Sequence, residues 1–347
     1  MIVLGIETTC DETSCSIVKN GSEILSNAIT SQIDLHAEYG GVVPELSCRR
    51  HVDVLIPVLK QCLTEADITL GMIDLIAVAY GPGLIGALLI GVTAAKTLSL
   101  ALDRPFIGVN HVEAHLYAAL MAQETPSEFP SLGVVVSGGH TALVLINGIG
   151  NYTLIGETVD DAIGEAFDKV GKQLGLPYPA GPQIEALAMK GNKNRFRFKP
   201  GKVKEKPLHF SFSGLKTAVL YTLKGQNSAE VTPLPLTEEN IQDISASFQQ
   251  AALTDVVDKA ILAAQKYQCN TLVFGGGVTN NKELRKMIAE KAPSIKTLWP
   301  PLGLSLDNAA MIAGLGYHRF LQKGCGDSLD LLPATRIPFK SNGEFVA

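Results

Sequence analysis

The sequence predicts an α/β protein built from two copies of one βββαβαβ unit, each a mixed sheet with helices on both faces. One observation is an internal duplication, because the strand–turn–strand pattern around Asn20-Gly21 recurs around Asn147-Gly148. A second is that a helical segment in each half precedes an apolar strand that ends in a glycine turn, Gly81-Pro82-Gly83 or Gly275-Gly276-Gly277. A third is the composition, 46% hydrophobic and 18% charged, which is typical of a compact globular protein.

The elements of the two copies follow each other in the same order. In the first copy we expect strands at 2–7, 15–19 and 23–27, a helix at 52–66, a strand at 75–79, a helix at 84–102 and a strand at 107–109. In the second we expect strands at 133–136 and 143–146, another from 152, a helix at 241–267, and strands at 271–274 and 297–299. We therefore predict an N-terminal lobe at 1–109, on which 324–347 packs back, and a C-terminal lobe at 110–323 with an insertion at about 160–235. A ligand cleft is expected between the lobes.

Composition limits the class of protein. The formal charge of −5 over 347 residues argues against a free-standing nucleic-acid binder, though not against a local basic patch or a basic partner. The six cysteines form no CxxC pair, which favours reduced thiols in a cytoplasmic protein. The first residues lack the features of a signal peptide. The apolar stretch 84–102 is predicted to be a buried core helix and not a membrane span, because it carries Lys96 and many small residues.

The segment 110–115, with the sequence NHVEAH, is the strongest candidate for a site of chemistry. On a helix, His111 and His115 lie one turn apart on the same face, where two imidazoles can bind one transition-metal ion if a third ligand joins them. Asp307, directly before an apolar helical segment, is the candidate third ligand, and two histidines with one carboxylate suit catalytic iron or zinc. The alternatives are histidines that bond to backbone at a helix start and an Asp307 that caps its helix.

Other segments also allow a functional and a structural interpretation. The glycine turns at 137–141 and 275–278 suit ligand binding, because a missing side chain exposes backbone N–H groups, but glycine can equally serve a tight turn. The segment 160–169 has four acids, which indicate either metal ligands or a solvated helix face. The segment 190–206 has eight basic residues, one acid and two phenylalanines, a composition that suits RNA contact or a solvated loop.

Taken in order along the chain, the motifs ETTCDET, NHVEAH, VSGGHT, DDAIGEAFDKVGK, FSFSGLKTA, GGGVTNNKELR and DNAAMIA resemble those of the TsaD family, the tRNA N6-adenosine threonylcarbamoyltransferases. The resemblance covers nearly the whole chain. It implies the two-lobed fold of the actin, heat-shock-chaperone and sugar-kinase (ASKHA) superfamily, with a metal in the cleft. It also implies transfer of threonylcarbamoyl from threonylcarbamoyl-AMP to N6 of adenosine 37 in tRNAs that read ANN codons, which forms t6A.

The resemblance assigns roles to individual residues. It implies that His111, His115 and Asp307 hold one divalent ion, with Fe²⁺ favoured and Zn²⁺ as the alternative. It implies that a second group of residues contacts the substrate: Val135, Val136, Ser137, Gly138, Gly139, Asp168, Gly181, Glu185 and Asn281. Asp11, in the turn after the first strand, is a candidate general base or orienting group.

Three positions depart from the family pattern, and none removes a predicted ligand. Thr9 replaces the usual Ser, Ala180 replaces the first glycine of YPGGP, and Ser305-Leu306 stand where Cys-Thr is usual.

The family also implies two protein partners, a smaller inactive paralogue of the TsaB type and a P-loop ATPase of the TsaE type. We expect the paralogue to dock through the helix at 52–66 and the tRNA to contact the basic segment at 190–206.

Three other functions fit part of the sequence. A sugar-kinase-like phosphotransferase or ATPase would explain the glycine turns but not a His-His-Asp set, since kinases hold Mg²⁺ with oxygen ligands. A metallopeptidase would need a glutamate directly after the first histidine, whereas Glu113 lies two positions on. A non-catalytic scaffold would bind nucleotide without turning it over.

Overall fold

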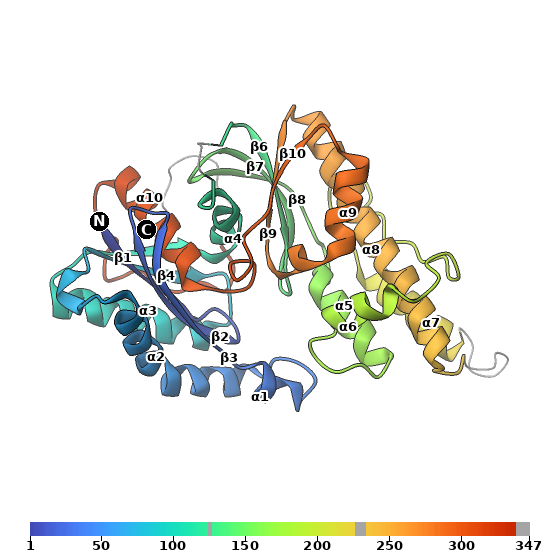
Figure 1. Ribbon diagram of the computed structural model, residues 1–347, viewed down its shortest axis with the longest axis horizontal. Helices are drawn as coiled ribbons and strands as arrows, with labels where there is room; N and C mark the ends of the chain where they lie inside the picture. The colour runs from blue at the N-terminus through green and yellow to red at the C-terminus, as the bar shows by residue number, and fades with distance from the viewer. Residues whose placement is uncertain (124–126, 226–233, 338–347) are drawn as a thin grey trace. The chain divides into compact units, whose positions relative to one another are not determined.

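The computed structural model describes residues 1–123, 127–225 and 234–337, and it contains two five-stranded sheets (Figure 1). The strand order is β3-β2-β1-β4-β5 in the first sheet and β8-β7-β6-β9-β10 in the second. In each copy the first strand is central. The second and third strands lie on one side of it, and the fourth and fifth lie on the other side. This identity of order confirms the α/β class and the duplicated unit that the sequence predicts.

The first sheet is mixed. Its strands are β1 (Ile2–Glu7), β2 (Glu12–Lys19), β3 (Glu23–Ser31), β4 (Leu75–Gly81) and β5 (Phe106–Asn110). β1 pairs antiparallel with β2 and parallel with β4, and β4 pairs parallel with β5. At the predicted hairpin, Asn20 and Gly21 have φ values of 51° and 84°, the left-handed conformation that this turn requires.

Helices cover both faces of the first sheet. They are α2 (Pro44–Ala66), α3 (Ile85–Leu102), α4 (His111–Leu120) and α10 (Ala309–Lys323), and the short helix α1 (Ile33–Ala37) follows β3 in the chain. Along β1, Leu4 and Ile6 join the core cluster formed with α2 and α3. Gly5 lies on the opposite face, where an added Cβ would come within 2.2 Å of the Ala309 carbonyl oxygen of α10. The two faces follow from the alternation of side chains along a strand.

The predicted helix at 52–66 begins earlier than expected, at Pro44. Proline is favoured in the first turn of a helix, because the N–H that it lacks would have no partner there. α3 is the one described helix whose length and apolar composition would allow it to cross a membrane. It packs on β4 with Leu88 and Val92 buried, and leaves Ile85 and Leu89 exposed.

The second sheet repeats the first. Its strands are β6 (Ser131–Val136), β7 (Thr141–Gly148), β8 (Asn151–Glu157), β9 (Thr271–Gly275) and β10 (Lys296–Leu298). β9 pairs parallel with both β6 and β10. The helices here are α5 (Ile163–Gln173), α6 (Gly181–Ala188), α7 (Ser213–Lys224), α8 (Glu238–Lys266) and α9 (Lys282–Lys291). α5, α6 and α7 all come from the predicted insertion.

The chain forms two compact units, and their boundaries differ from those of the predicted lobes at 1–109 and 110–323. Among the described residues, the first unit comprises 1–123, 127, 146–153 and 299–337, and the second comprises 128–145, 154–225 and 234–298. Of the segment 324–347 that was predicted to pack back on the first lobe, residues 338–347 lie outside the described residues. α4 and α10 thus belong with the first sheet, because α10 packs on β1, β2 and β4 and on α4 itself. Beyond α10, the Gly108 N–H donates to Asp327 Oδ2 at 2.7 Å, so this segment also lies against β5.

Candidate metal centre and substrate loops

The two histidines are positioned by the start of α4. Asn110 caps the helix, since its Oδ1 accepts from the N–H groups of Val112 at 2.9 Å and Glu113 at 3.2 Å. The helix therefore begins at His111, and both histidines lie on it one turn apart. His111 is 5% exposed and His115 is 1% exposed, so both imidazoles are withdrawn from bulk solvent.

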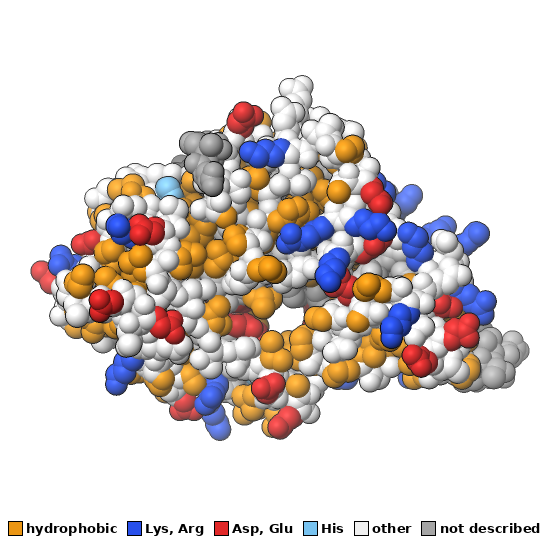
Figure 2. Space-filling model, in the orientation of Figure 1, with side chains coloured by type: hydrophobic (Ala, Val, Ile, Leu, Met, Phe, Trp, Pro, Cys, Tyr) orange, Lys and Arg blue, Asp and Glu red, His pale blue; other side chains and the backbone are white. Residues whose placement is uncertain are grey.

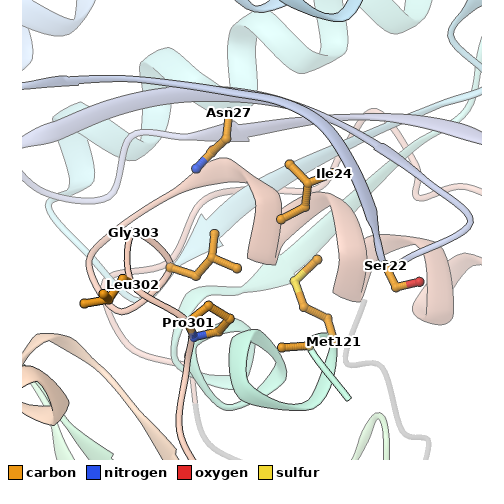
Figure 3. A pocket seen from close by; sticks show the side chains of 9 residues that line it. Ser22, Ile24, Asn27, Met121, Pro301, Leu302 and Gly303 are labelled. Carbon is orange, nitrogen blue, oxygen red and sulfur yellow. The ribbon is translucent and has the colours of Figure 1, made fainter. Parts of the chain in front are cut away.

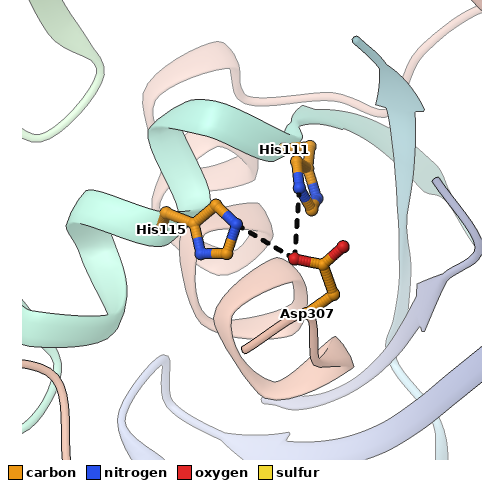
Figure 4. Close-up of side chains that lie close together, drawn as sticks. All are labelled: His111, His115 and Asp307. Carbon is orange, nitrogen blue, oxygen red and sulfur yellow. Dashed lines mark ion pairs between the residues drawn. The ribbon is translucent and has the colours of Figure 1, made fainter. Parts of the chain in front are cut away.

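Asp307 faces these histidines from the segment before α10. Its Oδ1 lies 3.1 Å from His115 Nε2 and 3.5 Å from His111 Nε2 (Figure 4). The structural alternative, in which Asp307 caps α10, is wrong. Asn308 is the cap, and its Oδ1 accepts from the Met311 N–H at 3.1 Å. The Asp307 carboxylate thus faces the two imidazoles.

The arrangement fits one divalent ion. The ligand atoms of His111, His115 and Asp307 all lie within 4.8 Å of one another, and no other such group of three occurs among the described residues. Neither ring nitrogen of His115 makes a hydrogen bond, although both are buried. Two imidazole nitrogens and one carboxylate oxygen form a donor set that suits iron or zinc and leaves coordination positions open.

Negative charge is concentrated around the imidazoles. Glu7 Oε2 lies 2.9 Å from His111 Nδ1. Burial lowers the pKa of His111, but the negative charges of Glu7 and Asp307 outweigh it and raise this pKa to about 9. At Glu12, the first residue of β2, burial together with the charges of Asp307 and Asp11 raises the pKa to about 10. This excess of acidic groups is what a bound cation would neutralise.

Glu113, between the two histidines, has a different partner. Its Oε2 lies 3.8 Å from Arg319 Nη1 of α10, and each side chain is only 13% exposed. Burial raises the pKa of Glu113, and the positive charge of Arg319 opposes that effect. The carboxylate is therefore held against a cation of α10, which does not favour Glu113 as the general base of a peptidase.

In the second unit, the glycines of the two turns serve different purposes. Gly276 has a φ of 97°, and an added Cβ would lie 2.5 Å from the Val136 carbonyl oxygen, so glycine is required there by the fold. At Gly138 and Gly139 an added Cβ would meet no atom within 4 Å, and neither residue has positive φ. Packing thus does not account for the glycines in the predicted substrate loop, which runs from Val135 to Gly139.

Three other predicted substrate residues bond to the ends of helices in the second unit. Asp168 Oδ1 accepts from the Ala180 N–H at 2.8 Å, Glu185 Oε1 accepts from the Lys282 N–H at 2.7 Å, and Asn281 caps α9. Gly181, the first residue of α6, directly follows Ala180. Ala180 is 1% exposed, and its methyl group faces Gly171 of α5, where a second Cβ would collide with it.

The acids at the start of the insertion join α5 to α7. Asp160 accepts hydrogen bonds from the hydroxyl groups of Ser211 at 2.6 Å and Ser213 at 2.7 Å, at the beginning of α7. Asp161 lies 3.1 Å from Lys216 Nζ of the same helix. The two acids precede α5, so they do not lie on a helix face, and among the described residues neither belongs to a group that could hold a metal ion.

One pocket in the first unit contains no catalytic group. It has a volume of about 480 Å³ and is lined largely by apolar side chains, among them Ile24, Met121, Pro301 and Leu302 (Figure 3). None of the residues that line it is charged. The residues that line the pocket thus include none of the three residues of the His-His-Asp cluster.

Comparison with known proteins decides which family these features represent. The family model described as TsaD, tRNA N6-adenosine threonylcarbamoyltransferase, matches residues 23–314. A protein of Protochlamydia amoebophila with the same description is 63% identical over 341 residues, which cover 98% of this chain and 99% of the relative. One from Chlamydia pneumoniae is 50% identical over 321 residues, 92% of each chain. The chain belongs to the TsaD family. It is accordingly a transferase that modifies tRNA.

Solved structures of other families share the fold of this TsaD member. HypF from T. kodakarensis aligns with a TM-score of 0.60 and 14% identity, over 93% of this chain and 48% of HypF. Component A of the Acidaminococcus fermentans (R)-2-hydroxyglutaryl-CoA dehydratase aligns with a TM-score of 0.53 and 14% identity, over 92% and 98% of the two chains. At this identity the likeness concerns the fold, and it confirms the predicted ASKHA architecture.

In this TsaD chain, the structure brings the three predicted ligands together, and it adds Glu7, which contacts His111 and which sequence reasoning missed. The only local signal was an acid at the carboxyl end of a buried strand, where functional side chains of α/β proteins often lie. Asp11 lies in the turn after that strand, in the first unit, whereas the predicted substrate residues all belong to the second.

Proposed function

We propose that this protein transfers the threonylcarbamoyl group from threonylcarbamoyl-AMP to N6 of adenosine 37 in tRNAs that read ANN codons. The observation that supports this most directly is the convergence of His111, His115 and Asp307 in a member of the TsaD family. We propose Fe²⁺ as the ion that they hold, with Zn²⁺ as the alternative. The cytoplasm is the proposed place of action.

In the proposed reaction, N6 of the adenosine forms a bond to the carbamoyl carbon, and AMP leaves with the electron pair of the bond that breaks. A bound divalent ion would supply Lewis-acid polarisation of the carbamoyl oxygen. Asp11 is proposed to accept or orient the proton that N6 loses. The loop from Val135 to Gly139, with Asp168, Gly181, Glu185 and Asn281, is proposed to bind the adenylate. Because an exocyclic amine is a weak nucleophile, positioning by these groups would supply much of the rate.

A transfer assay tests this function. The purified protein, with its proposed partners and ATP, is given threonylcarbamoyl-AMP and an unmodified ANN-decoding tRNA, and the digested nucleosides are analysed by mass spectrometry. We expect t6A from this tRNA and none from a tRNA that lacks the ANN-reading anticodon. If competent partners give no t6A, phosphate release or nucleotide binding without turnover would favour the ATPase or the scaffold function.

The α2–α3 helix pair is the proposed docking surface for a TsaB-type paralogue. Val52 and Ile56 of α2 are 63% and 54% exposed, and Ile85 and Leu89 of α3 are 49% and 48% exposed. The two helices pack on each other, so these exposed apolar side chains all belong to one helix pair. Exposed apolar surface of this kind is typical of a protein–protein interface. The TsaE-type ATPase is proposed as a further member of the complex.

Charge placed on this surface should prevent docking. We expect Val52→Glu with Ile56→Glu to abolish co-purification with the paralogue, since burial of a charge without a partner is costly. Leu321→Glu on α10, where Leu321 is 55% exposed, is the matched control and should leave co-purification unchanged. Equal recovery of the paralogue with both variants would exclude α2 as the docking helix.

The basic segment at 190–206 is the proposed contact for tRNA. Arg195, Arg197 and Lys199 are exposed and alternate with half-buried Phe196 and Phe198. The two phenylalanine rings stack with their centroids 5.9 Å apart and an interplanar angle of 17°. Figure 2 shows Lys and Arg side chains gathered on the surface of the second unit. Exposed cations next to aromatic rings suit phosphate contact and base stacking.

A further inference from the structure

We propose that Glu7 is a positioning residue that fixes the tautomer and the orientation of His111 for metal binding. This inference rests on the proposed metal centre and adds to it a residue that does not itself bind the ion. Glu7 is the last residue of β1, and its side chain is fully buried. The strand therefore places a carboxylate directly behind one of the two imidazoles.

The Glu7 carboxylate is held at both oxygens. Oε1 accepts from the Thr9 N–H at 2.6 Å, and Oε2 lies 2.9 Å from His111 Nδ1. Thr9 Oγ1 lies 3.3 Å from the same His111 nitrogen. Because a buried carboxylate is stable only with such partners, the two contacts fix the carboxylate with respect to both β1 and α4.

This contact determines where the proton of His111 lies. An ionised carboxylate accepts hydrogen bonds and donates none, so the His111 nitrogen that faces it must carry the hydrogen. In the neutral ring the lone pair then lies on Nε2, the nitrogen 3.5 Å from Asp307 Oδ1. Nε2 is thus ready to bind an ion on the side where Asp307 and His115 also present their ligand atoms.

His115 has no equivalent support. Its Nδ1 makes no hydrogen bond, so no carboxylate holds this ring from the side opposite Asp307. The centre is therefore asymmetric, because a second carboxylate supports Nδ1 of His111 and none supports Nδ1 of His115. Removal of the Glu7 carboxylate should act on metal affinity through His111, because nothing at His115 compensates for it.

Glu7→Gln is the variant that tests this role. The amide oxygen of the substituted side chain can still accept from the Thr9 N–H, which turns the amide NH₂ group towards His111 Nδ1. That nitrogen must then accept, so the hydrogen moves to Nε2 and blocks the metal-binding position. We expect the affinity for Zn²⁺ or Co²⁺, measured by competition with a chromophoric chelator, to fall by about 10- to 100-fold.

Glu113→Gln is the matched control. It makes the same change in another buried carboxylate, one that contacts Arg319 and not an imidazole. Its metal affinity should stay within about twofold of the parent protein, whereas a merely structural effect of losing a buried charge would lower both affinities. Equal affinity of Glu7→Gln and the parent protein would overturn the proposal.

The tautomer itself can be read by NMR without any variant. In the metal-free parent protein, ¹⁵N shifts of the neutral His111 ring should show hydrogen on Nδ1, the nitrogen that faces Glu7. Hydrogen on Nε2 would overturn the proposal, even if Glu7→Gln failed to fold. Neither measurement uses tRNA or threonylcarbamoyl-AMP, so a failed transfer assay would count against the proposed function and not against the role of Glu7.

Discussion

Substitution of His111 by alanine is expected to abolish threonylcarbamoyl transfer, with a loss of more than about 100-fold, because this removes a ligand and not only its support. The purified variant should also lose its bound metal, measured by elemental analysis. Asp307→Ala should have the same effect, since its Oδ1 lies near both imidazoles. The two residues are far apart in the sequence, so a shared loss of metal would identify one common site.

The matched control is His318→Ala. His318 belongs to the first unit as well, and its Nε2 lies 2.9 Å from the Tyr117 hydroxyl oxygen and not from a metal ligand. This variant should keep its metal and most of its transfer activity. Full activity of metal-free His111→Ala would remove the metal from the proposed reaction and leave the family assignment intact.

Neutralisation of the basic segment should have the second large effect. We expect the triple variant Arg195→Ser, Arg197→Ser, Lys199→Ser to bind tRNA more weakly and to lower the slope of log affinity against log salt by about two to three, since each phosphate contact contributes about 0.7 to 0.9. The measurement is a set of tRNA titrations at several salt concentrations. Metal content should not change, because these residues belong to the other unit.

A control for this variant must remove the same charge elsewhere. Lys19, Arg104 and Lys286 are exposed and lie outside the segment at 190–206. Their joint replacement by serine changes the net charge equally but should leave the salt slope close to that of the parent protein. If both triple variants gave the parent slope, the tRNA contact would have to lie outside 190–206.

The sequence was most informative where a contact is local. Asn20-Gly21 specifies its hairpin within two residues, and the spacing of His111 and His115 specifies a shared helix face. Pattern alone left two possible roles for Asp307, because Asp and Asn are both good N-caps and the chain presents them side by side. The choice depends on which side chain turns back to its own helix, and in the structure Asn308 does so.

Contacts between residues far apart in the sequence could not be predicted from such patterns. Glu7 is 104 residues from His111, and Asp160 is 51 residues from Ser211. Periodicity shows which face of an element is buried, but not which distant polar group it meets there. The boundaries of the lobes could not be predicted from such patterns either, because α10 is assigned to the first unit only by its packing on the first sheet.

The order of the ligands along the chain has a consequence for biosynthesis. His111 and His115 precede the second unit in the sequence, and Asp307 follows it, yet all three lie in the first unit. A ribosome therefore releases the two imidazoles long before it makes the carboxylate, and the complete donor set exists only after the chain has passed through the second unit and returned. If the three residues hold the ion as proposed, we expect tight metal loading only on a chain synthesised at least as far as Asp307.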